Sequence, residues 1–314
     1  MENNGKEIDF SARHNYLLRA FDGTLLPQDV PYFKSLKIAD QTWQVLSDGD
    51  YFYVLAGDRE AMCIDGGYGC GNARKYAEQL CGKPVHIIAN THDHFDHTAN
   101  NSYFDCAYMS AATAPLANHK MASFEGVDFP TDYQVKIIEP GYEFHLGSRD
   151  VEVFSFPDHA AGSISFLDRK SRMFFVGDEL SDWNKDLRRI TVEKFARQME
   201  VMWSHEAEYD WCCSGTQIFH KTYVQNYLNN ANWILAGHEG SFPVPELEPH
   251  KPMVNETDAE GHVIYNRRWH RMDDTLASMQ LHKAAGEDNS AQYRRFSYFS
   301  DCKIVYDVRK VREQ

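Results

Sequence analysis

The chain has little of what marks secreted or membrane-spanning proteins. Its seven cysteines are an odd number without a CxxC pair, which argues against a disulfide framework and against a thiolate zinc site. No apolar run approaches the roughly 20 residues of a membrane span. Residues 1–6 lack the apolar core of a signal peptide. These absences predict a cytoplasmic protein with reduced cysteines and no membrane partner.

Positive charge is also scarce. The 314 residues include 32 Lys and Arg against 46 Asp and Glu, which gives a formal net charge of −14. Such a field repels phosphate backbones, so we expect no nucleic-acid partner. The expected partner is a small-molecule substrate, and the composition leaves a homo-oligomer open.

Short apolar strands alternate with amphipathic helices through most of the chain. This alternation favours an α/β architecture, here in a single domain of residues 1–314. Residues 240–270 show little periodicity and are predicted to be a surface excursion, after which a helix and a last strand rejoin the core and the main sheet. Strands are predicted at 43–46, 51–55, 61–64, 85–89, 106–109, 151–156, 163–167, 173–176, 211–213 and 303–308, and helices at 72–81, 191–207, 221–235 and 275–285.

The most informative segment is Thr91-His92-Asp93-His94-Phe95-Asp96-His97, directly after a predicted strand. Imidazole nitrogen and carboxylate oxygen are ligands for zinc, manganese and iron in proteins. Alternate side chains of an extended stretch point the same way, so His92 and His94 can converge on one ion. Asp96 and His97 follow where the chain turns toward a helix, and they can serve a second ion. The segment therefore predicts a metal site.

Two further candidate ligands follow predicted strands. His159 stands just after the strand at 151–156, and Asp178 just after the strand at 173–176. In open α/β sheets, the binding crevice lies beyond the carboxyl ends of the strands. All three sources of ligands occupy such positions, so we predict that they serve one metal site.

The series Ile64-Asp65-Gly66-Gly67, the HxHxDH motif of residues 92–97, His159 and Asp178 resembles the metallo-β-lactamase superfamily, in its hydrolase branch. The order and spacing of these motifs match that family from about residue 43 to 237, and the last strand resembles its closing segment. The resemblance implies an αββα sandwich of two similar halves. It also implies that the metal ions lie in a cleft at the edge of the sandwich.

The resemblance implies a role for each matching position. Asp65 would brace the ligand loop by hydrogen bonds from behind, which fixes the orientation of the histidine rings. The alternative for Asp65 is a simple turn residue. Six side chains would hold the metal ions: His92, His94 and His159 the first ion, Asp96 and His97 the second ion, and Asp178 both.

One position departs from the family pattern. Family members usually carry a further histidine ligand after the strand that precedes the last long helix, and here Thr216 stands in its place. A neutral threonine hydroxyl is a poor zinc ligand, so the sequence leaves open whether one or two ions bind. His220 is a candidate substitute ligand, and the alternative is a surface histidine at the start of a helix.

The predicted activity is metal-dependent hydrolysis of an ester, lactone or thioester-type small molecule by metal-activated hydroxide. Zinc is the expected cofactor, as one or two ions, with manganese or iron as alternatives. Asp96 would orient the nucleophile and shuttle a proton. The alternatives are oxygen chemistry at a single iron, as in dioxygenases, and a non-catalytic metal-binding protein on the same fold.

Aromatic side chains are frequent, at 13% of the residues, and predict a pocket for an apolar or aromatic substrate. We expect Tyr68 and Trp183 to line it. Trp183 follows Asp178 on a loop that should overhang the metal ions, and the alternative is a core anchor for the next helix.

Overall fold

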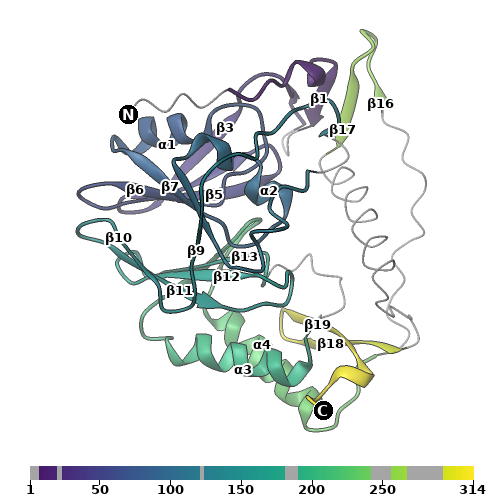
Figure 1. Ribbon diagram of the computed structural model, residues 1–314. Coiled ribbons are helices and arrows are strands. Elements are labelled where there is room, and N and C mark those ends of the chain that lie inside the picture. Colours follow the sequence, from purple (N-terminus) through teal and green to yellow (C-terminus); the bar gives the residue numbers. More distant parts are fainter. Residues whose placement is uncertain (1–6, 20–22, 121–123, 181–189, 242–255, 267–292) are drawn as a thin grey trace. The chain divides into compact units, whose positions relative to one another are not determined.

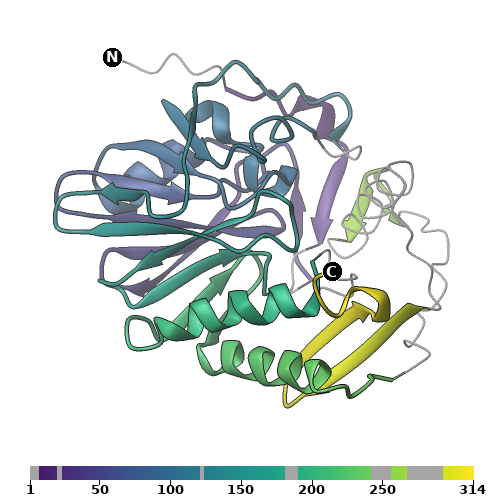
Figure 2. The ribbon, with the colours of Figure 1, turned by 60° about the horizontal axis from the view of Figure 1, so that its bottom comes forward.

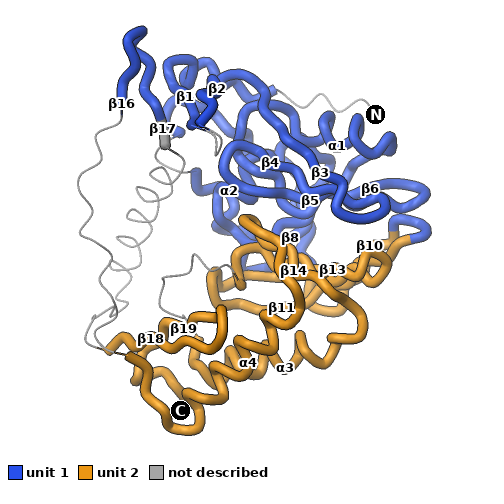
Figure 3. Tube along the Cα trace, turned by 180° about the vertical axis from the view of Figure 1, so that it is seen from behind, with its two compact units in different colours: residues 1–138, 146–148, 250–287 blue, residues 139–145, 149–249, 288–314 orange. Residues whose placement is uncertain are grey.

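The computed structural model describes residues 7–19, 23–120, 124–180, 190–241, 256–266 and 293–314. The chain divides into two compact units (Figure 3). Unit 1 comprises residues 1–138, 146–148 and 250–287, and unit 2 comprises residues 139–145, 149–249 and 288–314. Trp183 and the helix predicted at 275–285 lie outside the described residues.

The main sheet of unit 1 has seven strands in the order β3-β4-β5-β6-β7-β8-β9 (Figure 1). Neighbours are antiparallel from β3 to β6 and parallel from β6 to β9. The parallel strands β6 and β7 end at the same edge of the sheet, so the segments that follow them meet there. The strands are β3 (Phe33–Ala39), β4 (Thr42–Ser47), β5 (Asp50–Ala56), β6 (Ala61–Ile64), β7 (Val85–Ala89), β8 (Cys106–Met109) and β9 (Val135–Ile137).

The described residues of unit 1 form two α-helices, and the first has clear signals at both ends. In α1 (Ala73–Cys81), the side chain of Asn72 accepts a hydrogen bond from the backbone N–H of Lys75, and Gly82 ends the helix in the left-handed conformation. Ala73 and Ala77 of α1 belong to the core of the unit. The short helix α2 (Phe95–Thr98) lies within the predicted metal-binding segment.

A second, four-stranded sheet of unit 1 has the order β16-β17-β1-β2. Its strands are β1 (Tyr16–Arg19), β2 (Leu25–Pro27), β16 (Glu256–Thr257) and β17 (Val263–Asn266). Strand β17 pairs in parallel with β1 and antiparallel with β16. The stretch that we expected to be a surface excursion therefore contributes two strands, which pair with the N-terminal part of the chain.

The sheet of unit 2 has six strands in the order β10-β11-β12-β13-β14-β15. Helices α3 (Val192–Ser204) and α4 (Thr222–Leu235) lie side by side (Figure 2) and share an apolar core with β12 and β13. None of the described helices is long and apolar enough to cross a membrane. The strands are β10 (Glu143–His145), β11 (Asp150–Ser155), β12 (Ile164–Asp168), β13 (Met173–Gly177), β14 (Trp211–Ser214) and β15 (Ile218–His220).

The C-terminal strand corrects one expectation. Strand β19 (Cys302–Asp307) pairs only with β18 (Arg294–Phe299) and joins no larger sheet among the described residues. Its alternate side chains Cys302, Ile304 and Tyr306 are buried in the core that α3 and α4 share. The strand thus contributes to the core of unit 2 by packing on helices, whereas we expected pairing in the main sheet.

The mixed α/β fold that the sequence predicts is confirmed. Strands β6, β7 and β8 have the predicted bounds, and α1, α3 and α4 lie where helical periodicity placed them. The edge strands β3, β9, β10 and β15 were not predicted. In β3 the side chains of Lys34, Leu36 and Lys37 are exposed, so the apolar alternation of a half-buried strand is weak there.

Unit 2 contains a buried ion pair that supports a prediction about stability. Arg149 Nε and Nη2 lie 3.2 Å and 2.5 Å from Asp168 Oδ2, and both side chains are fully buried. Replacing Arg149 by methionine leaves the Asp168 carboxylate buried without its cation. We expect the free energy of unfolding to fall by about 3–5 kcal/mol, measured by urea denaturation.

The neighbouring Arg169 provides the matched control. Its side chain is 44% exposed and pairs with Glu152 and Glu208. An exposed pair contributes at most about 1 kcal/mol, so Arg169→Met should unfold close to the wild type. Equal losses of stability in both variants would contradict the importance of burial at Arg149.

Candidate metal centre

The metal-binding segment predicted from the sequence starts at the carboxyl end of β7. After Ala89 the chain stays extended and then turns into α2, where the N–H of His97 donates to the carbonyl of His94 (3.0 Å). The side chain of His94 is half-buried, whereas His92 and His97 are almost fully buried, at 1% and 0% exposure. Burying a polar imidazole ring costs free energy unless its nitrogens form hydrogen bonds or bind a metal ion.

The three imidazole rings lie close together. The ring centroid of His92 lies 4.5 Å from that of His94 and 4.1 Å from that of His97. Ring nitrogens of His92 lie within 4.8 Å of one in His94 and of one in His97. The carboxylate of Asp96 comes to 3.9 Å from Nε2 of His97. Unit 1 alone therefore brings three nitrogen donors and one carboxylate together.

Asp65 links the histidines to the end of β6. Its carboxylate accepts hydrogen bonds from the N–H of Thr91 (2.8 Å), from the Thr91 hydroxyl (2.8 Å) and from Nδ1 of His97 (2.9 Å). Asp65 is 3% exposed and has a left-handed backbone with φ of 61°. A non-glycine residue rarely adopts this conformation, and such residues cluster at functional sites.

These hydrogen bonds fix which ring nitrogen carries the proton. A carboxylate only accepts, so the Nδ1 of His97 that faces Asp65 is protonated. The Thr91 hydroxyl donates to Asp65, so its oxygen accepts from Nδ1 of His92, at 3.0 Å. In both rings Nε2 then has the lone pair that a metal ion needs. The donor set and its protonation thus fit a divalent metal such as zinc.

Asparagine side chains hold the backbone of this region. Asn90 Nδ2 donates to the carbonyl of His97 (3.0 Å), and Asn90 also forms a reciprocal amide pair with Asn101. Asn100 Nδ2 donates to the carbonyl of Gly66 (2.8 Å), whose own N–H donates to the carbonyl of His97 (3.0 Å). The loop after β6 and helix α2 are therefore tied to each other by buried hydrogen bonds.

Unit 2 positions the other two predicted ligands. Strands β11 and β13 run in the same direction, since each is antiparallel to β12. Their carboxyl ends therefore lie at the same edge, and His159 and Asp178 come after those ends. Nε2 of His159 lies 3.9 Å from Oδ2 of Asp178, so this pair is formed within unit 2.

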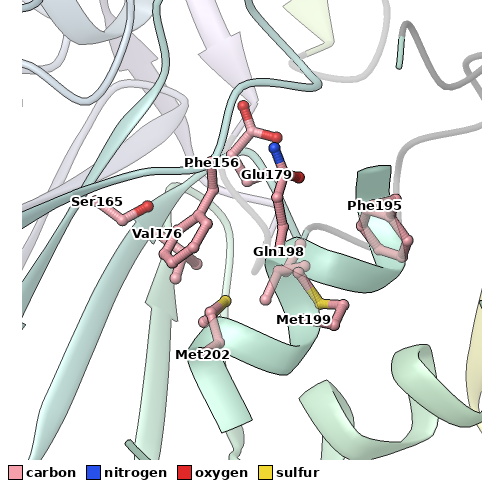
Figure 4. A pocket seen from close by; sticks show the side chains of 9 residues that line it. Phe156, Ser165, Val176, Glu179, Phe195, Gln198, Met199 and Met202 are labelled. Atoms are coloured by element: carbon pink, nitrogen blue, oxygen red, sulfur yellow. The ribbon is translucent and has the colours of Figure 1, made fainter. Parts of the chain in front are cut away.

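The side chain of Glu179 holds the backbone of the loop that contains His159. Its carboxylate accepts hydrogen bonds from the backbone N–H groups of Asp158, His159 and Ala160. Figure 4 shows Glu179 beside the apolar side chains of Phe156, Val176 and Met199. The residues that line this pocket leave no space for a water molecule. This burial, and secondarily the Asp158 carboxylate, raise the pKa of Glu179 to about 8.

Thr216 lies at the same edge of the sheet as Asp178. It is in the turn between β14 and β15, where the N–H of Gly215 donates to the carbonyl of Gly177 (3.3 Å). The backbone N–H of Thr216 donates to Oγ of Ser214 (3.2 Å), and the two hydroxyls lie 3.3 Å apart. The hydroxyl group of Thr216 therefore takes part in the turn.

The structure contradicts the idea that His220 is a substitute ligand. His220 pairs with Trp211 at the start of β14, whereas Ser214 at the end of β14 pairs with Gly177. Three residues of strand separate these two ends, which corresponds to roughly 10 Å. His220 is exposed on the opposite edge of the sheet from Asp178, where its Nδ1 lies 3.1 Å from Oγ1 of Thr222.

Tyr68, which we expected to line a substrate pocket, lies in the core of unit 1. It is 2% exposed and packs against Phe95 and Phe124, with ring centroids 6.3 Å and 5.5 Å away. A β-carbon at Gly49 would lie 1.8 Å from its hydroxyl oxygen, so Tyr68 requires glycine there. Its position supports α2 through Phe95.

The supporting residues Thr91, Asn90 and Glu179 were not identified from the sequence. Thr91 carried a usable signal, because it directly precedes His92 in the segment after β7. Glu179 follows Asp178 and could have been singled out as a second acidic residue at a strand end. The partners of these side chains are distant in sequence, so only the fold shows what they contact.

Comparisons with known proteins give consistent matches. The sequence model of the family described as "Metallo-beta-lactamase superfamily" matches residues 49–201. An acyl-coenzyme A thioesterase, MBLAC2, from Gallus gallus is 24% identical over 160 residues, which are 41% of this chain and 57% of that protein. A hydroxyacylglutathione hydrolase from Mesorhizobium japonicum is 30% identical over 94 residues, 30% of this chain and 33% of that protein. The chain thus matches between a third and about half of the length of these relatives.

Solved structures are similar at lower sequence identity. A metallo-beta-lactamase from Pontibacter korlensis is 15% identical with a TM-score of 0.49, and the match covers 64% of this chain and 99% of that one. The DIM-1 metallo-beta-lactamase is 16% identical with a TM-score of 0.49, over 65% of this chain and 99% of that one.

Proposed function

Because the chain belongs to the metallo-β-lactamase superfamily, we propose that it is a metal-dependent hydrolase of small-molecule thioesters. The observation that carries the proposal is the hydrogen-bond network of Asp65, Thr91, His92 and His97. It leaves Nε2 of both rings in the form that binds a metal ion. The thioester class is supported by the relatives that hydrolyse acyl-coenzyme A and hydroxyacylglutathione.

We assign six side chains as metal ligands, from two parts of the chain. A bound zinc ion would supply an acidified water and a positive charge that polarises a carbonyl. The ligands are His92, His94, Asp96, His97, His159 and Asp178.

The residues of this chain then have separate tasks. Asp65 holds His97 directly and His92 through Thr91, so both rings are oriented before the ion binds. Glu179 holds the backbone of residues 158–160 and thereby positions His159. Asp96 is a carboxylate at 7% exposure beside His97. It would orient the attacking water, take its proton and pass that proton to the thiolate that leaves when the C–S bond of the thioester breaks.

Thiol release from purified protein tests this proposal. The protein is prepared without affinity metal and given a hydroxyacylglutathione thioester and a short acyl-coenzyme A thioester. We expect thiol release that a chelator abolishes and added zinc restores. A sample of each thioester without protein serves as the negative control, because it measures the spontaneous release of thiol. Release that persists in chelator, or no release from either thioester, would contradict the proposal.

A further inference from the structure

Thr216 lies in the turn that follows β14, the strand beside β13 in unit 2. The two strands are parallel, with Ser214 paired to Gly177, and the N–H of Gly215 donates to the carbonyl of Gly177 (3.3 Å). Neighbouring strands of a sheet lie about 4.8 Å apart, so the residues that follow these two ends are close neighbours. Thr216 is therefore next to Asp178, a proposed metal ligand, and both belong to the same unit.

The hydroxyl group of Ser214 organises this turn. Its oxygen accepts from the backbone N–H groups of Thr216 (3.2 Å) and Gln217 (3.0 Å), and its hydrogen is donated to the carbonyl of Gln217 (3.0 Å). A hydroxyl group has one hydrogen and two lone pairs. All three are engaged in these bonds, so Ser214 has no further strong hydrogen bond to offer the Thr216 hydroxyl, which lies 3.3 Å away.

The Thr216 hydroxyl is thus a hydrogen-bond donor that the turn does not use up. Its side chain is half-buried, and within the described part of the chain the Ser214 hydroxyl is the one group at hydrogen-bonding distance from it. The usual protein ligands of zinc are thiolates, imidazoles and carboxylates, whereas side-chain hydroxyls serve as donors to a developing oxyanion. The chemistry of Thr216 therefore favours a contact with the substrate over a bond to the metal ion.

The substrate atom that such a donor stabilises is the carbonyl oxygen of the thioester. When the oxygen of water adds to the carbonyl carbon, the electron pair of the C=O π bond moves to the carbonyl oxygen, which becomes an oxyanion. The pair re-forms the C=O bond when the C–S bond breaks and the sulfur leaves with its bonding electrons. A donor aimed at the oxyanion strengthens its hydrogen bond as the negative charge develops. Because Asp178 is a proposed ligand of the ion that would polarise this carbonyl, the reacting group lies at the strand ends that flank Thr216.

We propose that Thr216 is a catalytic residue whose hydroxyl donates a hydrogen bond to the carbonyl oxygen of the thioester as this oxygen becomes an oxyanion. The proposal rests on the proposed thioester hydrolase function. It gives Thr216 a role in turnover and none in holding the metal ion.

Thr216→Val tests the role of the hydroxyl group in turnover. Valine keeps the β-branched shape, and the backbone N–H groups of the turn still donate to Ser214. We expect the turnover number with a hydroxyacylglutathione thioester to fall by at least about tenfold, with the Michaelis constant within about threefold of the wild type. Thr216→Ser restores a hydroxyl group and should keep the turnover number within about fivefold of the wild type.

Zinc affinity separates this role from that of a metal ligand. We expect both Thr216 variants to bind zinc within about twofold of the wild type, measured by competition with a chelating dye. Turnover of Thr216→Val at the wild-type rate, or a loss of zinc affinity large enough to explain its slower turnover, would overturn the proposal. Absence of thiol release from the wild-type protein would instead refute the proposed hydrolase function.

Thr222→Val is the matched control. Thr222 is an exposed threonine at the start of α4, and its hydroxyl lies 3.1 Å from Nδ1 of His220, on the opposite edge of the sheet from Asp178. This variant should match the wild type in turnover and in zinc affinity. A loss of turnover as large as that of Thr216→Val would show that the effect does not depend on the position of the hydroxyl group.

The binding of substrate analogues tests the contact without turnover. The probes are a trifluoromethyl ketone and the matching methyl ketone, each a thioether of N-acetylcysteamine, titrated by calorimetry into the whole zinc-loaded chain. The trifluoromethyl ketone adds water to form a tetrahedral hydrate, whereas the methyl ketone stays planar. We expect Thr216→Val to weaken the trifluoromethyl ketone by about tenfold and the methyl ketone by less than about twofold. Equal weakening of both probes, or no preference of the wild type for the trifluoromethyl ketone, would overturn the proposal.

Discussion

Asp65→Asn should lower the affinity of the protein for zinc by roughly 10–100-fold. The Asp65 carboxylate accepts from two donors of Thr91 and from Nδ1 of His97, and an asparagine amide can no longer accept all three. Asparagine tolerates the left-handed backbone, with φ of 61°, so the change tests the carboxylate and not the backbone. Zinc affinity is measured by competition with a chelating dye.

Asp48→Asn is the control for this prediction. Asp48 also has a left-handed backbone, with φ of 56°, and is 7% exposed. It lies in the turn between β4 and β5, outside the metal-binding segment. We expect its zinc affinity to stay within about twofold of the wild type. If Asp65→Asn also stayed within that range, the histidine rings would not depend on Asp65 for their orientation.

Asp96→Asn should reduce thioester turnover by about 10²–10⁴-fold at saturating zinc. The amide is almost the same size as the carboxylate but cannot accept a proton from the attacking water. Excess zinc separates this effect from a loss of bound metal, since Asp96 is also a proposed ligand. The turnover number and the Michaelis constant are both measured, and we expect the loss mainly in turnover.

Asp93→Asn is the matched control for Asp96→Asn, because Asp93 lies in the same segment but occupies a variable (x) position of the HxHxDH motif. Its turnover should remain within a few-fold of the wild type. Full turnover in Asp96→Asn would remove Asp96 from the proton-transfer role, and an equal loss in Asp93→Asn would indicate general disturbance of the loop.

The strands that carry the metal-binding segments were predictable from the sequence. Runs such as Val85–Ala89 combine β-branched residues with clear breakers at both ends, and β7 has the predicted bounds. Because ligands follow the ends of such strands, the locations of His92, His159 and Asp178 at sheet edges could be inferred as well. The alternation of strands and helices is also visible as a local pattern in the sequence, and it predicted the fold class correctly.

The accessory sheet of unit 1 could not be predicted in this way. It pairs β1 near the N-terminus with β17 far along the chain, and both are only four residues long. Periodicity is a local signal, so it says nothing about pairing between segments that are distant in sequence.

The orientation of individual side chains was the property that was hardest to predict from the sequence. Tyr68 was expected in a pocket, but the close approach of Gly49 and two phenylalanines places it in the core. His220 was considered as a ligand from its spacing to Thr216, and the antiparallel register of β14 and β15 puts it at the other end of the strand. A spacing in sequence could not distinguish these outcomes because the turn reverses the chain.

The most direct test of the account is the metal content of the protein purified without chelator or affinity metal, measured by elemental mass spectrometry. We predict at least one equivalent of zinc per chain, and its loss in both His92→Ala and Asp178→Ala, each of which removes one proposed ligand. The control variant His220→Ala should retain the metal, because His220 is not a proposed ligand. A wild-type protein without metal, or metal that persists in both ligand variants, would contradict the assignment of these side chains as a metal centre.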